Sequence, residues 1–302
     1  MRLVIKIGTS LLTNNKCQLD TVFLRGFIEQ IADLKHAGHQ IVIVTSGAVA
    51  CGRSEIDFKR EKKSIPFRQA LAAIGQGILI ETYRNFFKKY HIAVAQALLT
   101  GLDFTRRENF LNTKNVFELL LEKGVIPIVN ENDVTTIEAL KFGGNDILSA
   151  YVAAMISADY LVIMTDVEGL LDKGKVIPVV SKIDDSIRSL AGGAKSRHSI
   201  GGMAAKIEAA QYAVSACVSM FIVGGRHKDI LKKVVDSCKT FPPLNHPGTF
   251  FQSSISCIDS QKKWMKPQIK RTNWILVDEG ASNALKSRGK SLLPSGIHRK
   301  AR

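Results

Sequence analysis

The sequence predicts an α/β protein built around a mainly parallel β-sheet. Short apolar segments rich in β-branched residues alternate with segments whose apolar residues recur at helical spacing. The strand segments are apolar throughout, which is typical of strands covered on both faces, as in a parallel sheet. The regular succession of strand and helix agrees with that arrangement.

The first half of the chain contains three strands and two long helices in this interpretation. Residues 3–7 form an apolar strand interrupted by one lysine, and residues 19–38 form a helix with apolar positions every three or four residues, ending at Ala37-Gly38. Residues 41–45 form the second strand. A helical pattern covers residues 67–90, and residues 92–99 form a further strand.

The second half continues the alternation. A helix is expected over residues 109–123, a continuous apolar strand over 125–129, a helix over 146–157 and a strand over 160–165. Residues 202–215 read as a helix and 218–223 as a strand. The segment 242–261 is rich in Pro, Ser and Asn, so we place the domain boundary there, with one domain at residues 1–252 and a second segment at 253–302. A strand at 273–277 and a helix at 281–286 are expected in this segment, which is too short to fold easily alone.

Composition narrows the class of protein. Hydrophobic residues make up 45% and charged residues 23% of the 302, which is ordinary for a soluble protein. No apolar run reaches the roughly 18 residues of a membrane helix, and no secretory signal pattern is present, so we expect a cytoplasmic protein without membrane partners. The five cysteines are scattered without CxxC pairs, which predicts reduced thiols and no metal site.

The formal charge of +15 is concentrated towards the end of the chain. Residues 262–302 hold eleven lysines and arginines against two acids, Asp278 and Glu279. Such a segment can contact nucleic acid or another polyanion, or it can be a solvated surface. Because no nucleic-acid-reading motif accompanies the charge, a nucleic-acid partner is not expected.

Lys6 carries the first functional signal. It stands near the end of a buried strand, directly before the turn at Gly8, and a buried ammonium group is costly unless an anion pairs with it. A cation at the carboxyl end of such a strand is typical of a phosphate or carboxylate site in an α/β sheet. The alternative is that Lys6 only caps an edge strand.

Two further strands end in segments suited to ligand binding. Residues 45–52, Thr-Ser-Gly-Ala-Val-Ala-Cys-Gly, are small enough for backbone N–H groups to approach a ligand, and Ser46 adds a hydroxyl. Residues 130–133, Asn-Glu-Asn-Asp, suit recognition of an amine or amide. The alternatives are a tight strand-to-helix turn and a polar surface turn.

Two glycine-rich segments precede helices. In Gly143-Gly144-Asn145-Asp146 the polar pair either caps a helix or supplies a carboxylate that orients lysines or a metal-bound phosphate. In residues 199–206 the glycines make an anion-binding helix start with Lys206 one turn inside. Neither the P-loop spacing nor the dinucleotide-binding glycine pattern is present. Two lysines on separate elements, Lys6 and Lys206, suit the flanks of a transferring phosphoryl group.

Together these motifs resemble the amino acid kinase family, and within it the enzymes that phosphorylate glutamate. The likeness runs in order from Arg2 to about Phe251, and it rests on K-x-G-T-S at Lys6, V-T-S-G-A at 44–48, N-E-N-D at 130–133, N-D at 145–146, T-D at 165–166 and G-G-M-x-x-K at 201–206. The resemblance implies a three-layer sandwich with a central, mainly parallel sheet. It also implies ATP-dependent phosphorylation of the glutamate γ-carboxylate to γ-glutamyl phosphate with Mg²⁺, the first step of proline biosynthesis.

The resemblance assigns roles by motif position. Lys6 and Lys206 would stabilise charge on the moving phosphoryl group, and Asp146 would orient both lysines. Glutamate would be held by Ser46, Asp133 and Asn145. The nucleotide would be lined by Lys6, Thr165, Asp166, Ile200, Gly201, Gly202, Met203, Ala204, Ala205 and Lys206.

The chain departs from the family pattern in places. Gly144 stands where the family usually has Asp, and Ile200 where it usually has Thr, which puts the affinity for substrate and nucleotide in question. The tail resembles the start of a PUA domain, but it stops at residue 302, before a full PUA barrel is complete.

Other interpretations stay open at this point. Aspartate, N-acetylglutamate, carbamate and UMP kinases share the architecture, and a weakly active scaffold whose basic tail binds RNA is a non-enzymatic alternative. The family also suggests proline as a feedback inhibitor and assembly into a homo-oligomer, a dimer or tetramer.

Overall fold

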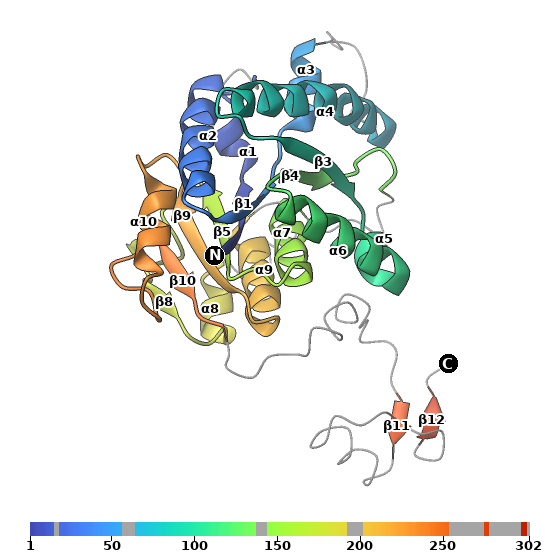
Figure 1. Cartoon of the computed structure of the whole chain (residues 1–302). Coiled ribbons are helices and arrows are strands. Elements are labelled where there is room, and N and C mark those ends of the chain that lie inside the picture. The colour runs from blue at the N-terminus through green and yellow to red at the C-terminus, as the bar shows by residue number, and fades with distance from the viewer. Residues whose placement is uncertain are drawn as a thin grey trace. The chain divides into compact units, whose positions relative to one another are not determined.

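A computed structural model of the chain describes residues 1–14, 18–55, 64–136, 144–191, 202–253, 275–277 and 297–300 (Figure 1). The chain divides into two compact units, Met1–Lys263 and Trp264–Arg302. The predicted boundary after residue 252 falls at the end of the described part of the first unit and stays a prediction.

The first unit is built on an eight-stranded sheet with the order β3-β4-β2-β1-β5-β9-β10-β8. Six neighbouring strands run parallel: β1 (Arg2–Ile7), β2 (Gln40–Val44), β3 (Val94–Leu99), β4 (Ile126–Glu131), β5 (Tyr160–Thr165) and β9 (Ser219–Gly224). At one edge β10 (Thr249–Phe251) pairs antiparallel with β9, and β8 (Val179–Val180) pairs parallel with β10. The prediction of a mainly parallel sheet is therefore confirmed, and each of the six expected strands is present.

The register of β1 decides where its lysine points. β1 lies at the centre of the sheet, and Lys6 pairs with Val44 of β2 and Ile163 of β5. Side chains alternate between the two faces of a strand, so Leu3, Ile5 and Ile7 share one face and Lys6 belongs to the other. The first three join the large apolar core.

That core lies between one face of the sheet and five helices: α1 (Thr9–Leu12), α2 (Thr21–His36), α3 (Ala48–Glu55), α4 (Ile65–Lys88) and α10 (Ile230–Ser237). Both long helices begin at capping residues. The Asp20 carboxylate accepts a hydrogen bond from the Phe23 N–H, and the Ser64 hydroxyl accepts one from the Phe67 N–H.

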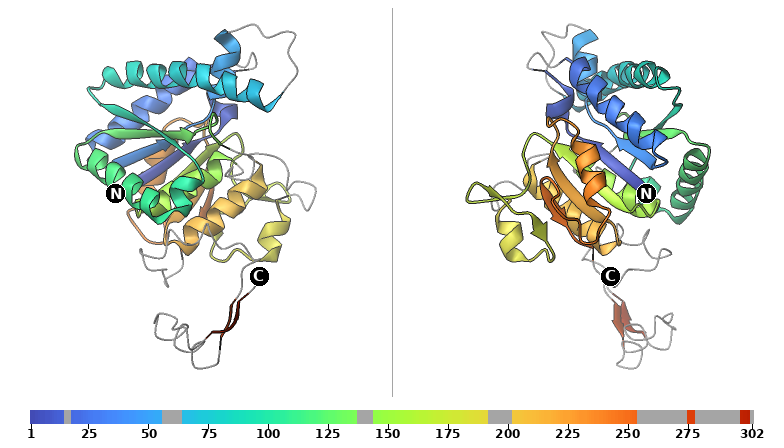
Figure 2. Two further views of the ribbon diagram at one scale, coloured as in Figure 1. Left: turned by 90° about the vertical axis from the view of Figure 1, so that its right-hand side faces the viewer. Right: turned by 60° about the vertical axis from the view of Figure 1, so that its left-hand side comes forward.

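The opposite face is covered by α6 (Arg107–Glu122), α7 (Asn145–Met155) and α9 (Met203–Ser215), which Figure 1 shows together on the other side of the strands from α2 and α4. The two views of Figure 2 show the sheet enclosed between these two helical layers. α7 packs against the central strands and is buried on nearly every side, from Asp146 to Met155. The fold is the expected three-layer sandwich.

Several short elements of the first unit are absent from the sequence-based prediction. They are the helices α1, α3, α5 (Leu102–Thr105), α8 (Asp185–Ser189) and α10, the edge strands β8 and β10, and a hairpin of β6 (Leu171–Asp172) and β7 (Lys175–Val176). None is longer than α3 and α10, with eight residues each, which is shorter than the roughly 11–18 residues over which helical periodicity is assessed. In the described parts of the chain, none of the helices combines the length and apolar character that crossing a bilayer requires.

The second unit contains β11 (Ile275–Val277), which pairs antiparallel with β12 (Ile297–Lys300). β11 falls inside the strand expected at 273–277, whereas the helix expected at 281–286 lies outside the described residues. The expectation of reduced thiols is wrong for Cys217, which forms a disulfide bond, while Cys51 and Cys238 are free.

Candidate active site

A cavity of about 670 Å³ opens where the parallel strands end. The carboxyl ends of parallel strands share one edge of a sheet, so the segments after β1, β2, β4 and β5 meet there. The starts of α7 and α9 complete the walls. Among the residues that line the cavity are Lys6, Ser46, Asp133, Asn145, Asp146, Thr165, Asp166 and Lys206.

Three buried charges form the floor of the cavity. The Lys6 Nζ lies 2.5 Å from Asp146 Oδ1, and the Lys206 Nζ lies 3.1 Å from Asp146 Oδ2. The lysines are each 5% exposed and the aspartate 1% exposed. With all three groups ionised, two ammonium groups face one carboxylate, so the trio carries a net charge of +1.

Such a buried surplus of positive charge is costly, and an anion is the ligand that would compensate it. The pKa of Lys6 is lowered, chiefly because burial disfavours the charged ammonium, and the neighbouring Lys206 acts in the same direction. Asp146 and Asp166 oppose that shift. The trio is therefore suited to bind phosphate.

Local structure fixes the carboxylate between the two amines. Asp146 is the second residue of α7, and α7 begins after Gly144, whose φ of 130° lies in a region that favours glycine. A residue other than glycine would be strained at this position of the backbone. Lys206 lies in the first turn of α9, where its N–H donates to the Gly202 carbonyl.

A network of amide side chains forms a second wall. The Asn145 Nδ2 lies 2.9 Å from Ser46 Oγ, 2.7 Å from the Thr45 carbonyl oxygen and 3.0 Å from Asn130 Oδ1. The buried Asn130 in turn donates to Gln76 Oε1 at 2.9 Å. These bonds tie the ends of β2 and β4 to the start of α7 and fix the orientation of the Asn145 side chain.

The remaining predicted residues fall into three groups. Thr165 and Asp166 line the cavity beyond β5, with the Thr165 hydroxyl 3.0 Å from Asp166 Oδ1. Gly202, Met203, Ala204 and Ala205 form the cap and first turn of α9 but do not line the cavity. Ile200 and Gly201 lie outside the described residues.

Two arginines reach the cavity from helices and are absent from the predicted site: Arg53 of α3 and Arg68 of α4. Gly8, Thr9 and Ser10 of the motif after β1 also line it. An exposed arginine on a helix has no distinctive pattern, so no sequence signal singles out Arg53 or Arg68. The pairing of Gln76 with Asn130 likewise depends on tertiary contact.

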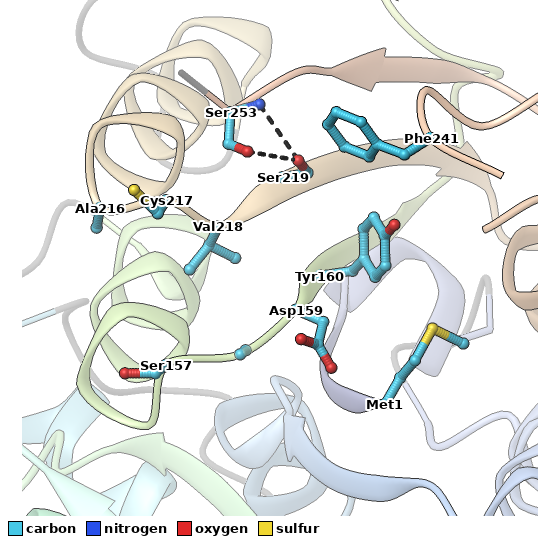
Figure 3. A pocket seen from close by; sticks show the side chains of 11 residues that line it. Met1, Ser157, Asp159, Tyr160, Ala216, Cys217, Val218, Ser219, Phe241 and Ser253 are labelled. Atoms are coloured by element: carbon cyan, nitrogen blue, oxygen red, sulfur yellow. Dashed lines mark hydrogen bonds between the residues drawn. The ribbon is translucent and has the colours of Figure 1, made fainter. Parts of the chain in front are cut away.

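A second cavity, of about 430 Å³, lies at the other end of the strands (Figure 3). It is lined by residues such as Met1, Asp159, Tyr160 and Phe241, and by Ser219, whose hydroxyl lies 3.0 Å from the Ser253 hydroxyl. It contains none of the predicted site residues. We therefore take the cavity at the carboxyl edge as the candidate active site.

Within the described ranges, no group of three or more His, Cys, Asp and Glu side chains could hold a metal ion. Mg²⁺ does not require such a cage, because it commonly keeps several waters and binds through substrate phosphates with one or two carboxylates. The acidic side chains of the cavity wall are compatible with an ion that arrives with a nucleotide.

Comparison with known proteins adds an independent line of evidence. The sequence matches the amino acid kinase family over residues 1–224. It is 41% identical to the glutamate 5-kinase of Caldanaerobacter subterraneus subsp. tengcongensis, in an alignment covering 98% of this chain and 80% of that protein. The glutamate 5-kinase of Carboxydothermus hydrogenoformans is 40% identical, with 98% and 79% covered. The glutamate 5-kinase 1 of Bacillus subtilis is 38% identical, with 98% and 81% covered.

Proposed function

We propose that this chain, which belongs to the amino acid kinase family, transfers the γ-phosphoryl group of ATP to the γ-carboxylate of glutamate. This is the reaction of a glutamate 5-kinase, the first step of proline biosynthesis. The observation that carries the proposal is the buried trio of Lys6, Asp146 and Lys206 at the carboxyl edge of the sheet. The relatives' activity supplies the identity of the acceptor.

The reaction requires charge stabilisation more than proton transfer. A γ-carboxylate oxygen attacks the γ-phosphorus, the bond from that phosphorus to the bridging oxygen breaks, and ADP leaves with the electron pair. The carboxylate is already a nucleophile, so no general base is needed. The barrier comes from repulsion between anions and from charge that develops on the phosphoryl oxygens, which positioned cations reduce.

We assign that task to the two lysines. Lys6 and Lys206 come from different layers of the fold and converge on the two oxygens of Asp146. The carboxylate thereby fixes the positions of both ammonium groups before the substrate arrives. Thr165, Asp166 and the segment from Ile200 to Lys206 would line the nucleotide, with Gly202, Met203, Ala204 and Ala205 presenting the backbone N–H groups of the helix start.

Glutamate would occupy the other side of the cavity. Ser46 and Asn145, already joined by a hydrogen bond, offer polar atoms to a carboxylate or amine, and Asp133 offers a counter-charge for the α-ammonium group. ATP would bind as its magnesium complex, in which the metal neutralises part of the phosphate charge.

Three further properties belong to the proposal. They are feedback inhibition by proline, assembly into a homo-oligomer and a cytoplasmic location. The other acceptors of the family, and a scaffold whose tail binds RNA, are less favoured because the relatives reported above are glutamate 5-kinases over nearly the whole chain.

An acceptor panel tests the proposal. ADP release is measured with glutamate, aspartate, N-acetylglutamate, carbamate and UMP, each with and without Mg²⁺. We expect turnover with glutamate and Mg²⁺ that exceeds turnover with every other acceptor. Preference for another acceptor, or no glutamate-dependent ADP release, would contradict it.

The variant Lys206→Ala tests the role of this lysine in the same assay. The Lys206 ammonium group would stabilise charge that develops in the transition state, so its loss should lower kcat by at least about a hundredfold while the KM for glutamate changes little. Equal kcat in the variant and the parent would remove Lys206 from the proposed mechanism.

A further inference from the structure

We propose that Arg53 and Arg68 bind the α-carboxylate of the acceptor and so determine that the enzyme selects an α-amino dicarboxylic acid. This inference rests on the proposed function, because it concerns how the same cavity recognises glutamate. It begins from the cations that line that cavity.

Four positively charged side chains line the cavity, among the described residues: Lys6, Lys206, Arg53 and Arg68. The two lysines are buried and both engage Asp146. The two arginines are exposed, and neither guanidinium has an ion pair or hydrogen bond in the part of the chain that the structure describes. They are therefore the cations of this wall that remain available to a ligand.

Topology places the two arginines on the acceptor side. Strand β1, which carries Lys6, lies between β2 on one side and β5 on the other. The nucleotide residues Thr165 and Asp166 follow β5, whereas α3 and α4 come directly after β2 in the chain. Next to Arg68, the Gln69 side chain donates to the Val134 carbonyl at 3.3 Å, which ties the start of α4 to the turn that holds Asp133.

The crossing of α3 and α4 holds the arginines on one wall. A Cβ on Gly52 would lie 2.0 Å from the Leu71 carbonyl oxygen, and a Cβ on Gly75 would lie 1.8 Å from that of Ala48. The two backbones therefore approach in a way that only glycine permits. Arg53 directly follows Gly52, and Arg68 lies about one turn before Leu71, so both side chains start near this crossing and reach the same cavity.

The chemistry of glutamate leaves one group without a partner. Its γ-carboxylate must face the phosphoryl group near the lysines, and its α-ammonium group has Asp133. The α-carboxylate has no counter-ion among the residues assigned so far. A guanidinium binds a carboxylate through two parallel hydrogen bonds, and two guanidinium groups on one wall suit its two oxygens.

The test uses Arg53→Ala, Arg68→Ala and the double variant, with Arg84→Ala as a matched control. Arg84 lies on the same helix as Arg68, is exposed and does not line the cavity. Steady-state kinetics are measured with glutamate and with glutamate α-amide, which lacks the α-carboxylate charge. Glutamate binding is measured in parallel by titration calorimetry.

We expect each single variant to raise the KM and the Kd for glutamate by about ten- to a hundredfold, which is the usual effect of losing a charge-assisted hydrogen bond. The kcat and the KM for ATP should stay near their parent values. The preference for glutamate over its α-amide should fall to a similar extent, most of all in the double variant. Arg68→Lys should recover only part of the lost affinity for glutamate, because an ammonium group cannot form the two parallel hydrogen bonds that a guanidinium makes to a carboxylate.

Other results would overturn the inference. An unchanged KM for glutamate in the double variant would exclude the two arginines from acceptor binding, and a raised KM for ATP alone would assign them to the nucleotide. If the parent protein fails to phosphorylate glutamate at all, the proposed function itself is wrong. If the parent phosphorylates glutamate but Arg53→Ala, Arg68→Ala and the double variant show the same kinetics as the control Arg84→Ala, the inference fails and the proposed function stands.

Discussion

At the scale of single residues, the central feature is one carboxylate shared by two buried amines. The two carboxylate oxygens of Asp146 contact Lys6 and Lys206 separately, so the trio itself holds two positive charges and one negative charge when all three groups are ionised. A protein whose only need was stability would not retain such a surplus, because replacing buried charges by apolar groups is often neutral or stabilising. The trio is better understood as a preformed anion site.

The lowered pKa of Lys6 predicts how activity depends on pH. In the free enzyme, burial and the neighbouring Lys206 depress the pKa of Lys6 below 10.5, with Asp146 and Asp166 only partly offsetting them. The charged form is the one that binds phosphate, so kcat/KM for ATP should fall as the pH rises through this lowered pKa. Bound phosphates favour the ammonium form, so the alkaline fall in kcat should occur at higher pH.

The measurement is a pair of pH–rate profiles for kcat/KM and kcat on the alkaline side. A fall in kcat/KM for ATP centred at or above pH 10.5 would show that burial does not depress the pKa of Lys6.

The pH dependence of the free energy of unfolding offers a second check on the pKa of Lys6. Between the lowered pKa and 10.5 the unfolded chain binds more protons than the folded one, so Lys6 makes the free energy of unfolding rise with pH. Lys6→Met should remove that contribution.

The residues that sequence could identify are those whose chemistry conflicts with their surroundings. A lysine inside an apolar strand and a polar run at a strand end both contradict simple packing, so Lys6 and Asp133 are visible without a structure. Asp146 and Lys206 follow from their positions near helix starts. Arg53 and Arg68 could not be predicted, because an exposed arginine on a helix is consistent with its local sequence, and only the tertiary structure shows that these two line the cavity.

At the scale of elements, the long and strongly apolar ones were predictable. The six parallel strands are apolar at nearly every position, and α2 and α4 span several turns, so their signals are large. α3 is different, because its eight residues make only about two turns and include Gly52. Its helical form depends on close packing against α4, a tertiary effect that no local pattern reports.

The α3–α4 crossing predicts opposite effects for two glycines of the same helix. In Gly75→Ala the new methyl group would meet the Ala48 carbonyl and the Gly52 nitrogen, both backbone atoms, so the helices must separate. We expect a loss of about 1–3 kcal/mol in the free energy of unfolding. In Gly77→Ala nothing lies within 4 Å of the new methyl group, so removing a helical glycine should add about 0.5–1 kcal/mol.

Urea unfolding of the two variants and the parent checks this pair. The sign of the difference is the decisive quantity, because both variants make the same chemical change two residues apart in α4. Equal effects of Gly75→Ala and Gly77→Ala would mean that the two helices do not approach as closely as the structure indicates. Gly75→Ala should also raise the KM for glutamate if Arg53 and Arg68 act as inferred.

At the scale of the whole molecule, the sheet brings its functional segments together by topology alone. Residues far apart in the chain, such as Lys6 and Lys206, meet because β1, β5 and β9 are adjacent and parallel, and their carboxyl ends share an edge. The alternation of apolar segments predicts such an edge but not the strand order. The order depends on long-range pairing, and so the shape of the cavity could not be inferred from sequence.

The division of the chain predicts that the first unit is sufficient for catalysis. The eight-stranded sheet, the apolar core and every described residue of the candidate site lie within Met1–Lys263. A chain that ends at Lys263 should therefore retain glutamate-dependent ADP release and a single cooperative unfolding transition.

The shortened chain loses the nine lysines and arginines that follow Lys263, so its binding to RNA or other polyanions should be weaker and less sensitive to salt. Kinetics, thermal unfolding and filter binding at two salt concentrations are compared for the two lengths, with Lys206→Ala in each as the inactive control. A shortened chain that unfolds as cooperatively as the parent but no longer phosphorylates glutamate would show that the second unit contributes directly to the reaction.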